Sequence, residues 1–385
     1  MAKITKANQQ LAAAHNRALA IKLLQHHNQL SRRQLAQMIG LQNSTLSYIV
    51  RELLEKNILI STGKRESKTV GQKQVLLEIN PKLGWCAGIS IFSGNVSIIY
   101  YDAAGNQLAK KSIAIPNDFD NLAQQLRQTI NLFLAEFDAP PGQFLGMGIG
   151  VPGIVQPETG VICTSSDLKL TDYPLKHKLQ REFADTPISI LHDADAAAIA
   201  EKTAGSARDL HSFIYLMISI IKKGAGFSFA GYGSSIHLDG QHQAGFHHAA
   251  GEIDHRLYPQ YDEILTKEQL DLLADPDAKL GPTLLEYAKQ LLTSLAIITN
   301  LLDPQAYVLG TNFPLKNRQF LAYLYDNLPN QLIQFPDRSI QIHYAKLGEE
   351  AVCHGAALAA LEQALIKRAA EDFTNNDNPI TQLII

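Results

Sequence analysis

Acidic side chains and a histidine occupy positions in this sequence where a ligand could meet them. Asp193 follows an apolar strand, predicted over residues 188–191, and precedes an alanine-rich helix. A carboxylate at such a strand end can act as a base, accept hydrogen bonds from a hydroxyl group, or simply cap the helix. Glu252 and His255 are three residues apart. They would meet one ligand if this segment is helical, and would otherwise form a surface pair.

A tight turn is predicted directly after another strand. The sequence Gly150-Val151-Pro152-Gly153 combines the two residue types that favour sharp turns, and Gly153 would let the backbone approach a ligand closely. A plain surface loop is an equally good interpretation of this turn taken alone. Asp167, further along the chain, is an additional candidate for the same site.

Polar side chains of another kind follow one face of a helix predicted over residues 43–56. They are Ser44, Thr45, Ser47, Tyr48 and Arg51, opposite an apolar stripe. Short donors and acceptors with one aromatic ring and one guanidinium suit the base edges and phosphates of a DNA major groove. The alternative is a plain three-helix bundle with a polar outer face.

Charge is distributed unevenly along the chain. Residues 1–80 hold 12 Lys and Arg against 4 Glu and no Asp, a net charge of +8, whereas the whole chain of 385 residues carries −3. A small basic domain joined to a large acidic one is typical of proteins that bind nucleic acid. The other explanation of the basic residues is an ordinary solvated surface.

Three helices and a hairpin are predicted to carry the basic region. The first helix spans residues 16–27, and the second lies between Ser31, an N-cap residue, and Gly40, which tolerates positive φ. Strands over 58–60 and 75–79 flank a basic loop, so the third helix is followed by a wing. The predicted DNA contacts are Arg32, Gln42, Asn43, Ser44, Thr45, Ser47, Tyr48, Arg51, Lys64, Arg65 and Lys73.

From Trp85 onward one order of elements is predicted twice. Three strands, a helix and a strand are expected over residues 86–92, 96–101, 107–115, 117–137 and 144–149. The same order returns near 213–220, 226–231, 235–238, 283–302 and 306–309. A β-β-β-α-β unit that occurs twice predicts two α/β lobes with a cleft between them.

Composition excludes several classes of protein. Hydrophobic residues make up 46% of the chain and charged residues 18%, which supports packed cores and excludes a disordered chain. No apolar run reaches the roughly 18 residues of a membrane span. The three cysteines, Cys86, Cys163 and Cys353, are scattered, which excludes a disulfide scaffold. We therefore expect a cytoplasmic protein without membrane contact.

Taken together, these segments resemble the ROK family (repressors, open reading frames and kinases), and specifically its xylose-repressor-like transcription factors. The resemblance runs from Asn16 to about Leu361. It is carried by SRRQLAQMIGLQNSTLSYIVRELLEKNIL, GVPGIVQPETGVI, HDADAAAIAE, GEIDH, LLDPQAYVLG and HGAALAAL, which occur in the family's order. In the family's kinases, the segment similar to HDADAAAIAE carries the catalytic Asp.

The resemblance implies an α/β fold with an N-terminal winged helix-turn-helix and a two-lobed actin-like (ribonuclease H-like) ROK domain. The expected domains are 1–80 for DNA binding, 81–190 for the first lobe, and 191–385 for the second lobe with the C-terminal helix and tail. It also implies that a sugar binds between the lobes, to Gly153, Asp167, Asp193, Glu252 and His255.

The chain departs from the family's kinases at both phosphate-binding loops. Their first loop, Asp-Xaa-Gly-Gly-Thr, is replaced by Ser90-Ile91-Phe92-Ser93-Gly94, and the second keeps only Gly224-Ala225-Gly226. Phosphoryl transfer depends mainly on positioning phosphate and metal. We therefore predict a protein that binds sugar without phosphorylating it, that has no catalytic residues and that uses no cofactor.

Two further departures concern metal and DNA. The family's zinc site combines a histidine with three cysteines, and no cysteine occurs in the stretch after His255, so we predict no metal. The family's Gly-Gly-Arg minor-groove motif is Val70-Gly71-Gln72 here, which predicts weaker or different reading of that groove.

Three functional hypotheses follow. The first is a sugar-responsive repressor of a carbohydrate operon that binds double-stranded operator DNA as a homodimer or homotetramer, with xylose or a related mono- or disaccharide as effector. The second is a ROK-type sugar kinase with a DNA-binding appendage. The third is a regulator whose degenerate cleft is controlled by a protein partner. The basic domain opposes the second hypothesis, and the set Asp193, Glu252 and His255 favours the first over the third.

Overall fold

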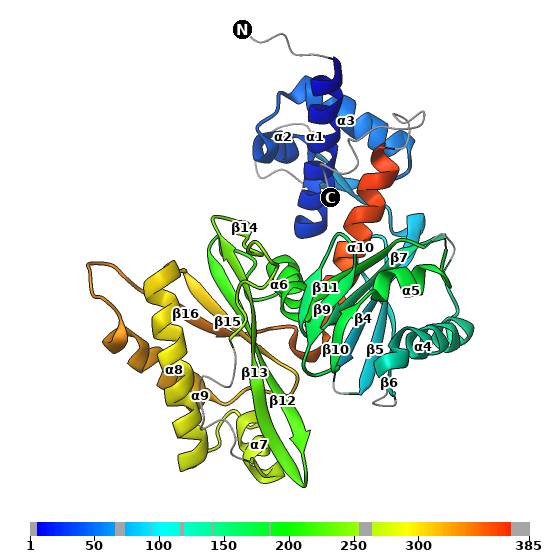
Figure 1. Ribbon diagram of the computed structural model, residues 1–385. Coiled ribbons are helices and arrows are strands. Elements are labelled where there is room, and N and C mark those ends of the chain that lie inside the picture. Colours follow the sequence, from blue (N-terminus) through cyan, green and yellow to red (C-terminus); the bar gives the residue numbers. More distant parts are fainter. Residues whose placement is uncertain are drawn as a thin grey trace.

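A small N-terminal domain lies above two α/β lobes in the computed structural model (Figure 1). The structure describes residues 6–65, 74–92, 94–115, 119–140, 142–184, 186–253 and 264–370. The two lobes lie side by side, and helix α10 (Ala351–Ala370) runs from the first lobe up to the small domain. Among the described residues, no helix has both the length and the apolar character that crossing a lipid bilayer requires.

The N-terminal domain is a winged helix-turn-helix, as predicted. It consists of α1 (Lys6–His27), α2 (Arg32–Ile39), α3 (Asn43–Glu55) and a sheet of β1 (Leu30–Ser31), β3 (Gln74–Ile79) and β2 (Leu59–Arg65), in that order. Helix α1 begins at Lys6 rather than at the predicted Asn16. The added residues include Ala12, Ala13 and Ala14, and alanine has the highest helix propensity.

Local signals determine where α2 begins and ends. The hydroxyl of Ser31 accepts a hydrogen bond from the Gln34 amide at 3.3 Å, and the Gln34 side chain accepts one from the Ser31 amide at 2.9 Å. This capping box satisfies two amides at the start of the helix. Gly40 ends the helix in the left-handed region, with φ of 77°. Both caps confirm the prediction.

The first lobe is a mixed five-stranded sheet of order β11-β7-β4-β5-β6. Its elements are β4 (Gly84–Phe92), β5 (Asn95–Asp102), β6 (Gln107–Ala114), α4 (Leu122–Glu136), β7 (Gln143–Val151) and β11 (Ile188–His192). A smaller sheet of β8 (Ile154–Gln156), β9 (Val161–Ser165) and β10 (Leu170–Tyr173) and the short helix α5 (Leu175–Gln180) complete it.

The second lobe repeats this arrangement in the sheet order β14-β13-β12-β15-β16. Its elements are β12 (Phe213–Lys223), β13 (Gly226–Leu238), β14 (Gln241–His242), α7 (Lys267–Ala274), α8 (Pro282–Leu302), β15 (Ala306–Thr311), α9 (Arg318–Asn327) and β16 (Gln341–Tyr344). In both lobes the first strand pairs antiparallel with the second and parallel with the strand after the long helix. The predicted repeat is therefore confirmed. The two strands predicted over 226–231 and 235–238 form the single strand β13, because pairing with β12 continues through an irregularity at Ser219/Ile220.

Two helices lie between the sheets. Helix α6 (Asp193–Ala204) follows β11, and α10 packs against α6 and against β4 and β7 of the first lobe. The approach is close: a Cβ atom on Gly355 would lie 1.6 Å from the Ala196 carbonyl oxygen, so only glycine fits. The C-terminal helix, which the sequence-based division placed in the range of the second lobe, thus packs against the first-lobe sheet as well as against α6. The boundaries at residues 80 and 190 stay predictions.

Candidate functional site

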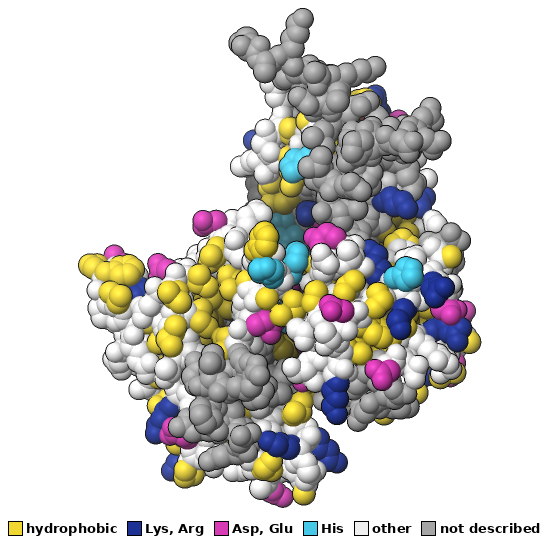
Figure 2. Space-filling model, viewed as in Figure 1, with side chains coloured by type: hydrophobic (Ala, Val, Ile, Leu, Met, Phe, Trp, Pro, Cys, Tyr) yellow, Lys and Arg dark blue, Asp and Glu magenta, His cyan; other side chains and the backbone are white. Residues whose placement is uncertain are grey.

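A cavity of about 650 Å³ lies between the two lobes. The first lobe contributes the turn between β7 and β8 and the end of β9, and the second lobe contributes β12, β13 and the segment before residue 254. The cavity brings together Gly153, Asp167, Asp193 and Glu252. His255 lies outside the described residues. In the space-filling view, histidine and acidic side chains appear near the junction of the lobes (Figure 2).

The turn after β7 approaches β9 so closely that it requires glycine. Gly153 has φ of 108°, and a Cβ atom there would lie 2.3 Å from the carbonyl oxygen of Thr164. Both the backbone conformation and the lack of space exclude a larger side chain. This close contact with β9 shapes the wall of the cavity, and the approach of the same backbone to a ligand stays a prediction.

Asp193 is the first residue of α6 and is 7% exposed. One carboxylate oxygen accepts a hydrogen bond from the Ala194 amide at 2.7 Å and lies 3.1 Å from Nε2 of His192. The carboxylate thus stabilises the positive end of the helix while it lines the cavity. The N-cap position belongs to His192, without a side-chain capping bond, and the role of Asp193 as a sugar ligand stays a prediction.

His192 is a site residue that the sequence analysis did not identify. Its Nε2 lies 3.1 Å from the Asp193 carboxylate and 3.3 Å from that of Glu252, so one ring joins the end of β11 in the first lobe to a segment of the second. Gly233 on β13 makes room for the ring, because a Cβ atom there would lie 3.0 Å from Nε2. His192 ends β11 and Asp193 begins α6. Because consecutive side chains of a strand point to opposite faces, the alternation of a strand does not predict that these two side chains meet.

The charges in the cavity favour a protonated His192. Burial alone would lower the pKa of His192, but the hydrogen bond to Asp193 and the negative charges of Asp193, Asp195 and Glu252 outweigh burial and raise this pKa to about 9. Burial raises the pKa of Glu252, although the positive charge of His192 opposes that shift. The Glu252 side chain is 37% exposed and stays open to a ligand.

We expect the stability of the protein to depend on pH through His192. The pKa of this histidine is higher in the folded state than the ordinary value of 6.5, so its contribution is complete below pH 6.5 and is lost as the pH rises through about 9. Over this interval the free energy of unfolding should fall by about 3 kcal/mol more in the parent than in a His192→Asn variant. Urea unfolding of both proteins across this pH range measures the difference.

Two partly buried histidines do not obscure this measurement. The pKa values of His26 and His237 are both lowered to about 4, chiefly by burial, so these residues affect stability below pH 6.5. Parallel pH curves for the parent and the His192→Asn variant would contradict the ion bridge.

Asp195 does not line the cavity and pairs instead with a histidine of the second lobe. Its carboxylate lies 2.8 Å from Nε2 of His242 on β14. Burial would raise the pKa of Asp195, but the hydrogen bond from His242 and the charges of His192 and His242 lower it. Asp195 therefore supports the first turn of α6 from outside the cavity.

The two segments that resemble the phosphate loops of the ROK kinases lie at the ends of paired strands. Strands β4 and β5 pair up to Phe92 and Asn95, which leaves only residues 93–94 between them. In the second lobe, the Asn312 side chain accepts a hydrogen bond from the Ile220 amide at 2.9 Å and donates one to the Ile220 carbonyl at 2.7 Å. A backbone amide that is bonded in this way is not available to a phosphate.

Within the described residues, no group of three or more histidine, cysteine or acidic side chains is arranged to hold a metal ion. His255 and the segment that follows it are not among them. The absence of a metal site stays a prediction.

The face of α3 that was predicted to meet DNA is open to solvent. The apolar stripe of Leu46, Ile49, Val50 and Leu53 is buried, which turns the polar face outward. Arg32 and Gln42, which precede α3, are exposed. The six predicted contacts on α3 itself are also exposed, namely Asn43, Ser44, Thr45, Ser47, Tyr48 and Arg51. Lys64 and Arg65 belong to β2, and Lys73 lies outside the described residues.

Tyr48 and Arg51 form a pair on this face. The Arg51 guanidinium carbon lies 5.2 Å from the centre of the Tyr48 ring, a cation–π arrangement. Below them, the buried guanidinium of Arg17 on α1 donates to the Glu52 carboxylate at 2.9 Å. This partly buried ion pair joins α3 to α1 and so helps to position the exposed face.

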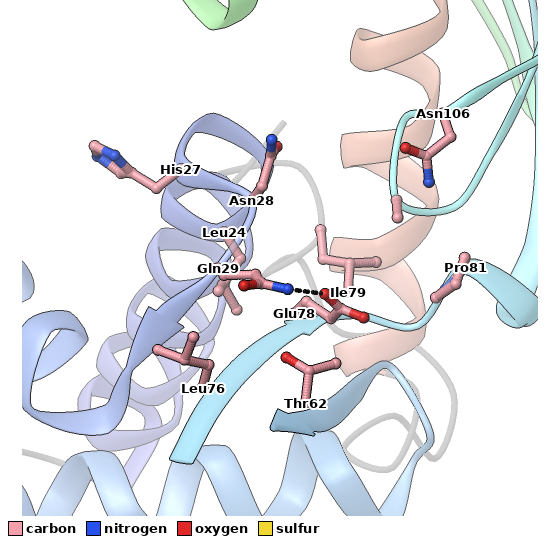
Figure 3. A pocket seen from close by; sticks show the side chains of 11 residues that line it. Leu24, His27, Asn28, Gln29, Thr62, Leu76, Glu78, Ile79, Pro81 and Asn106 are labelled. Carbon is pink, nitrogen blue, oxygen red and sulfur yellow. Dashed lines mark hydrogen bonds between the residues drawn. The ribbon is translucent and has the colours of Figure 1, made fainter. Parts of the chain in front are cut away.

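A second cavity, of about 820 Å³, lies where the N-terminal domain meets the first lobe (Figure 3). His27 and Asn28 at the end of α1 line one side, and Pro81 and Asn106 line the other. Gln29 donates a hydrogen bond to Glu78 at 2.7 Å within it. Among the residues whose side chains the structure describes, none of those predicted to bind sugar or DNA lines this cavity.

Comparisons with known proteins agree with this architecture. Residues 86–266 match the family model described as the ROK family, and residues 19–60 match a winged helix-turn-helix DNA-binding model. A putative xylose repressor of Caldicellulosiruptor sp. is 28% identical over 67% of this chain, and the match spans 62% of that relative's length. The xylose repressor of Staphylococcus xylosus is 23% identical over 91% of this chain and 95% of its own length.

Solved structures share the fold. A ROK family transcriptional regulator, described as a homolog of the Escherichia coli MLC protein, superposes with a TM-score of 0.72 at 20% identity and covers 94% of this chain and 98% of its own. A ROK family glucokinase from Streptomyces griseus has a TM-score of 0.53 at 19% identity and covers 72% of this chain and 99% of its own. The predicted fold, a winged helix-turn-helix followed by a two-lobed α/β domain, is confirmed.

Proposed function

We propose that this chain, which matches a ROK family model over residues 86–266 and a winged helix-turn-helix model over residues 19–60, is a sugar-responsive transcriptional repressor of a carbohydrate-utilisation operon. One observation carries this proposal: the same chain exposes the polar face of α3 and holds an interlobe cavity walled by Asp167, Asp193 and Glu252. Carboxylates form strong hydrogen bonds with hydroxyl groups, and a sugar offers several hydroxyls at once.

We propose D-xylose or a related mono- or disaccharide as the effector. The relatives from Caldicellulosiruptor, Bacillus and Staphylococcus are named xylose repressors, whereas the Escherichia coli relative is named an N-acetylglucosamine repressor. The cavity itself supports a polyhydroxylated ligand, since Ser219 and Ser228 line it beside the carboxylates. His255 and Gly153 belong to the proposed sugar ligands.

In this proposal a homodimer or homotetramer binds a palindromic operator. One recognition helix contacts few bases, and a two-fold axis doubles the contacts. Sugar in the cavity favours a closed arrangement of the lobes, which changes the spacing of the two α3 helices. The sugar-free form then has the spacing that fits DNA. A hundredfold difference in sugar affinity between the two forms corresponds to about 2.7 kcal/mol.

The test combines sugar binding with DNA release. A thermal-shift screen over pentoses, hexoses and amino sugars identifies the effector, because a ligand that binds only the folded state raises the melting temperature. Double-stranded DNA selected from a random pool then serves as operator. The proposal requires that a stabilising sugar changes operator affinity. DNA binding without any stabilising sugar would instead favour a cleft controlled by a protein partner.

We also propose that the protein has no sugar kinase activity, although ROK kinases share its fold. Two observations support this proposal: β4 pairs with β5 up to Phe92, and β12 pairs with β13 up to Lys223 and Gly226, so both segments that resemble phosphate loops are short turns between paired strands. A coupled assay with ATP, magnesium and the sugar panel should show no turnover. A rate above about 1 per second, as in ordinary kinases, would establish the kinase alternative.

A further inference from the structure

The segment that joins α6 to β12 contacts the DNA-binding domain. Nη2 of Arg208, in this segment, donates a hydrogen bond to the His26 carbonyl at 3.3 Å in the last turn of α1. The last carbonyls of a helix have no partner within the helix and carry partial negative charge, so a guanidinium is a favourable neighbour. Arg208 thus links the second-lobe connection to the helix that supports α3.

The first lobe holds the DNA-binding domain through a different element, α10. Lys22 on α1 lies 2.6 Å from the Glu362 carboxylate, and Lys56 after α3 donates to the Ala369 carbonyl at 3.1 Å. The domain is therefore held by α10 on one side and by Arg208 on the other. The contacts of α10 accompany a hydrophobic core shared by α1 and α10, whereas Arg208 lies in the segment that leads into β12, so a change in the angle between the lobes would act on the Arg208 contact first.

The backbone that carries Arg208 is fixed to the hinge between the lobes. The chain crosses from one lobe to the other through residues 205–212 and returns through residues 345–350. Glu201 is fully buried, and its carboxylate accepts hydrogen bonds from the Ser206 amide at 2.6 Å and the Leu347 amide at 2.7 Å. One side chain thereby holds both crossings.

The next residue of α6 supports the same segment. The Lys202 ammonium donates to the Arg208 carbonyl at 3.1 Å and also to the Leu210 carbonyl. Arg208 is therefore presented from an anchored backbone.

Helix α6 connects this hinge to the effector cavity. Its first residue, Asp193, lines the cavity, and Glu201 and Lys202 lie in its last turn, so the two ends are about 18 Å apart at 1.5 Å per residue. Buried alanines along the helix pack it against α10 and the sheets, which makes it a rigid element. A displacement at the cavity is carried to residues 205–210 by this helix.

An open space borders one side of the carboxyl end of α1. The cavity of about 820 Å³ in Figure 3 separates His27 and Asn28 from Pro81 and Asn106 of the first lobe. The middle of α1 is fixed, because Ile21 and Leu24 belong to one hydrophobic core with residues of the first lobe and of α10. At the carboxyl end, beside the open space, the polar contact of Arg208 can change without disrupting this core.

We propose that Arg208 is the residue through which movement of the second lobe reaches the DNA-binding domain, by holding the carboxyl end of α1 to the hinge segment. This inference rests on the proposed function as a sugar-responsive repressor. It predicts that removing Arg208 separates sugar binding from DNA release while both binding activities persist.

The first test compares the full-length parent with Arg208→Ala and with the control Arg318→Ala, whose side chain pairs with Asp277 on the second lobe. D-xylose is the first probe, followed by D-glucose and N-acetyl-D-glucosamine. The sugar that stabilises the parent should raise the melting temperature of all three proteins equally. It should weaken operator binding by about tenfold or more in the parent and the control, and by less than about threefold in Arg208→Ala.

The second test needs no sugar. Amide hydrogen exchange at the end of α1 and in β1 should be faster in Arg208→Ala than in the parent and unchanged in Arg318→Ala. Unchanged exchange in Arg208→Ala, or sugar-induced release of operator equal to that of the parent, would overturn the role of Arg208. A parent that is stabilised by sugar but never released from operator would instead contradict the proposed function.

Discussion

Replacing Arg51 by alanine is expected to weaken operator binding about 5- to 150-fold, since a side chain that contacts a base in the major groove contributes about 1–3 kcal/mol. Arg51 lies on the exposed face of α3 with its side chain 63% exposed, and its neighbour Tyr48 is 53% exposed. Tyr48→Ala should also weaken binding, because the tyrosine ring supports the guanidinium as well as facing outward. Fluorescence anisotropy with a labelled operator measures both effects.

The double variant and a set of operator variants show how Arg51 and Tyr48 contribute to binding. Because the two side chains touch, the double variant should lose less affinity than the sum of the single losses. If Arg51 contacts a base, discrimination between operator variants falls; if it contacts only phosphate, affinity falls uniformly and the salt dependence decreases. Arg181→Ala, an exposed arginine of the first lobe, serves as the control. Unchanged affinity in both Arg51→Ala and Tyr48→Ala would remove α3 from the interface.

The second large effect is expected from Asp193→Ala, which should bind operator and no longer respond to sugar. The carboxylate lines the cavity, and a hydrogen bond to a charged group contributes about 1.5–3 kcal/mol, so sugar affinity should fall about 10- to 150-fold. The substitution also removes one of the two carboxylates that hold the His192 ring. In a cell the result would be permanent repression.

The folding of this variant needs a check, because Asp193 also accepts a hydrogen bond from the Ala194 amide in the first turn of α6. Its melting temperature without sugar and its operator affinity should be compared with those of Asp271→Ala, an exposed acid of α7 far along the chain. Asp193→Asn keeps the shape and one acceptor, and it should lie between the parent and Asp193→Ala in sugar affinity. If Asp193→Ala folds and releases operator on sugar addition as readily as the parent, the sensor lies elsewhere.

Short-range signals made much of this protein predictable from its sequence. The capping box of Ser31 with Gln34, the left-handed Gly40 and the apolar stripe of α3 involve residues within a few positions of one another. Helical periodicity relates such residues directly, so the exposed face of α3 follows from the buried one. The repeated order of strands and helices similarly predicted two lobes with a cleft.

Only the tertiary structure decided which distant side chains meet. His192 and Glu252 lie on different lobes, Glu201 bonds the Leu347 amide, and Arg208 reaches the carbonyl of His26. No period relates residues so far apart in sequence, because such contacts depend on how whole sheets and helices pack. For the same reason, the sequence did not predict that α10 packs against the sheet of the first lobe, since this helix follows the second lobe in the chain. The sequence by itself determined the helices of the DNA-binding domain and the repeated order of the main strands and helices, whereas packing decided which groups share the cavity and the hinge.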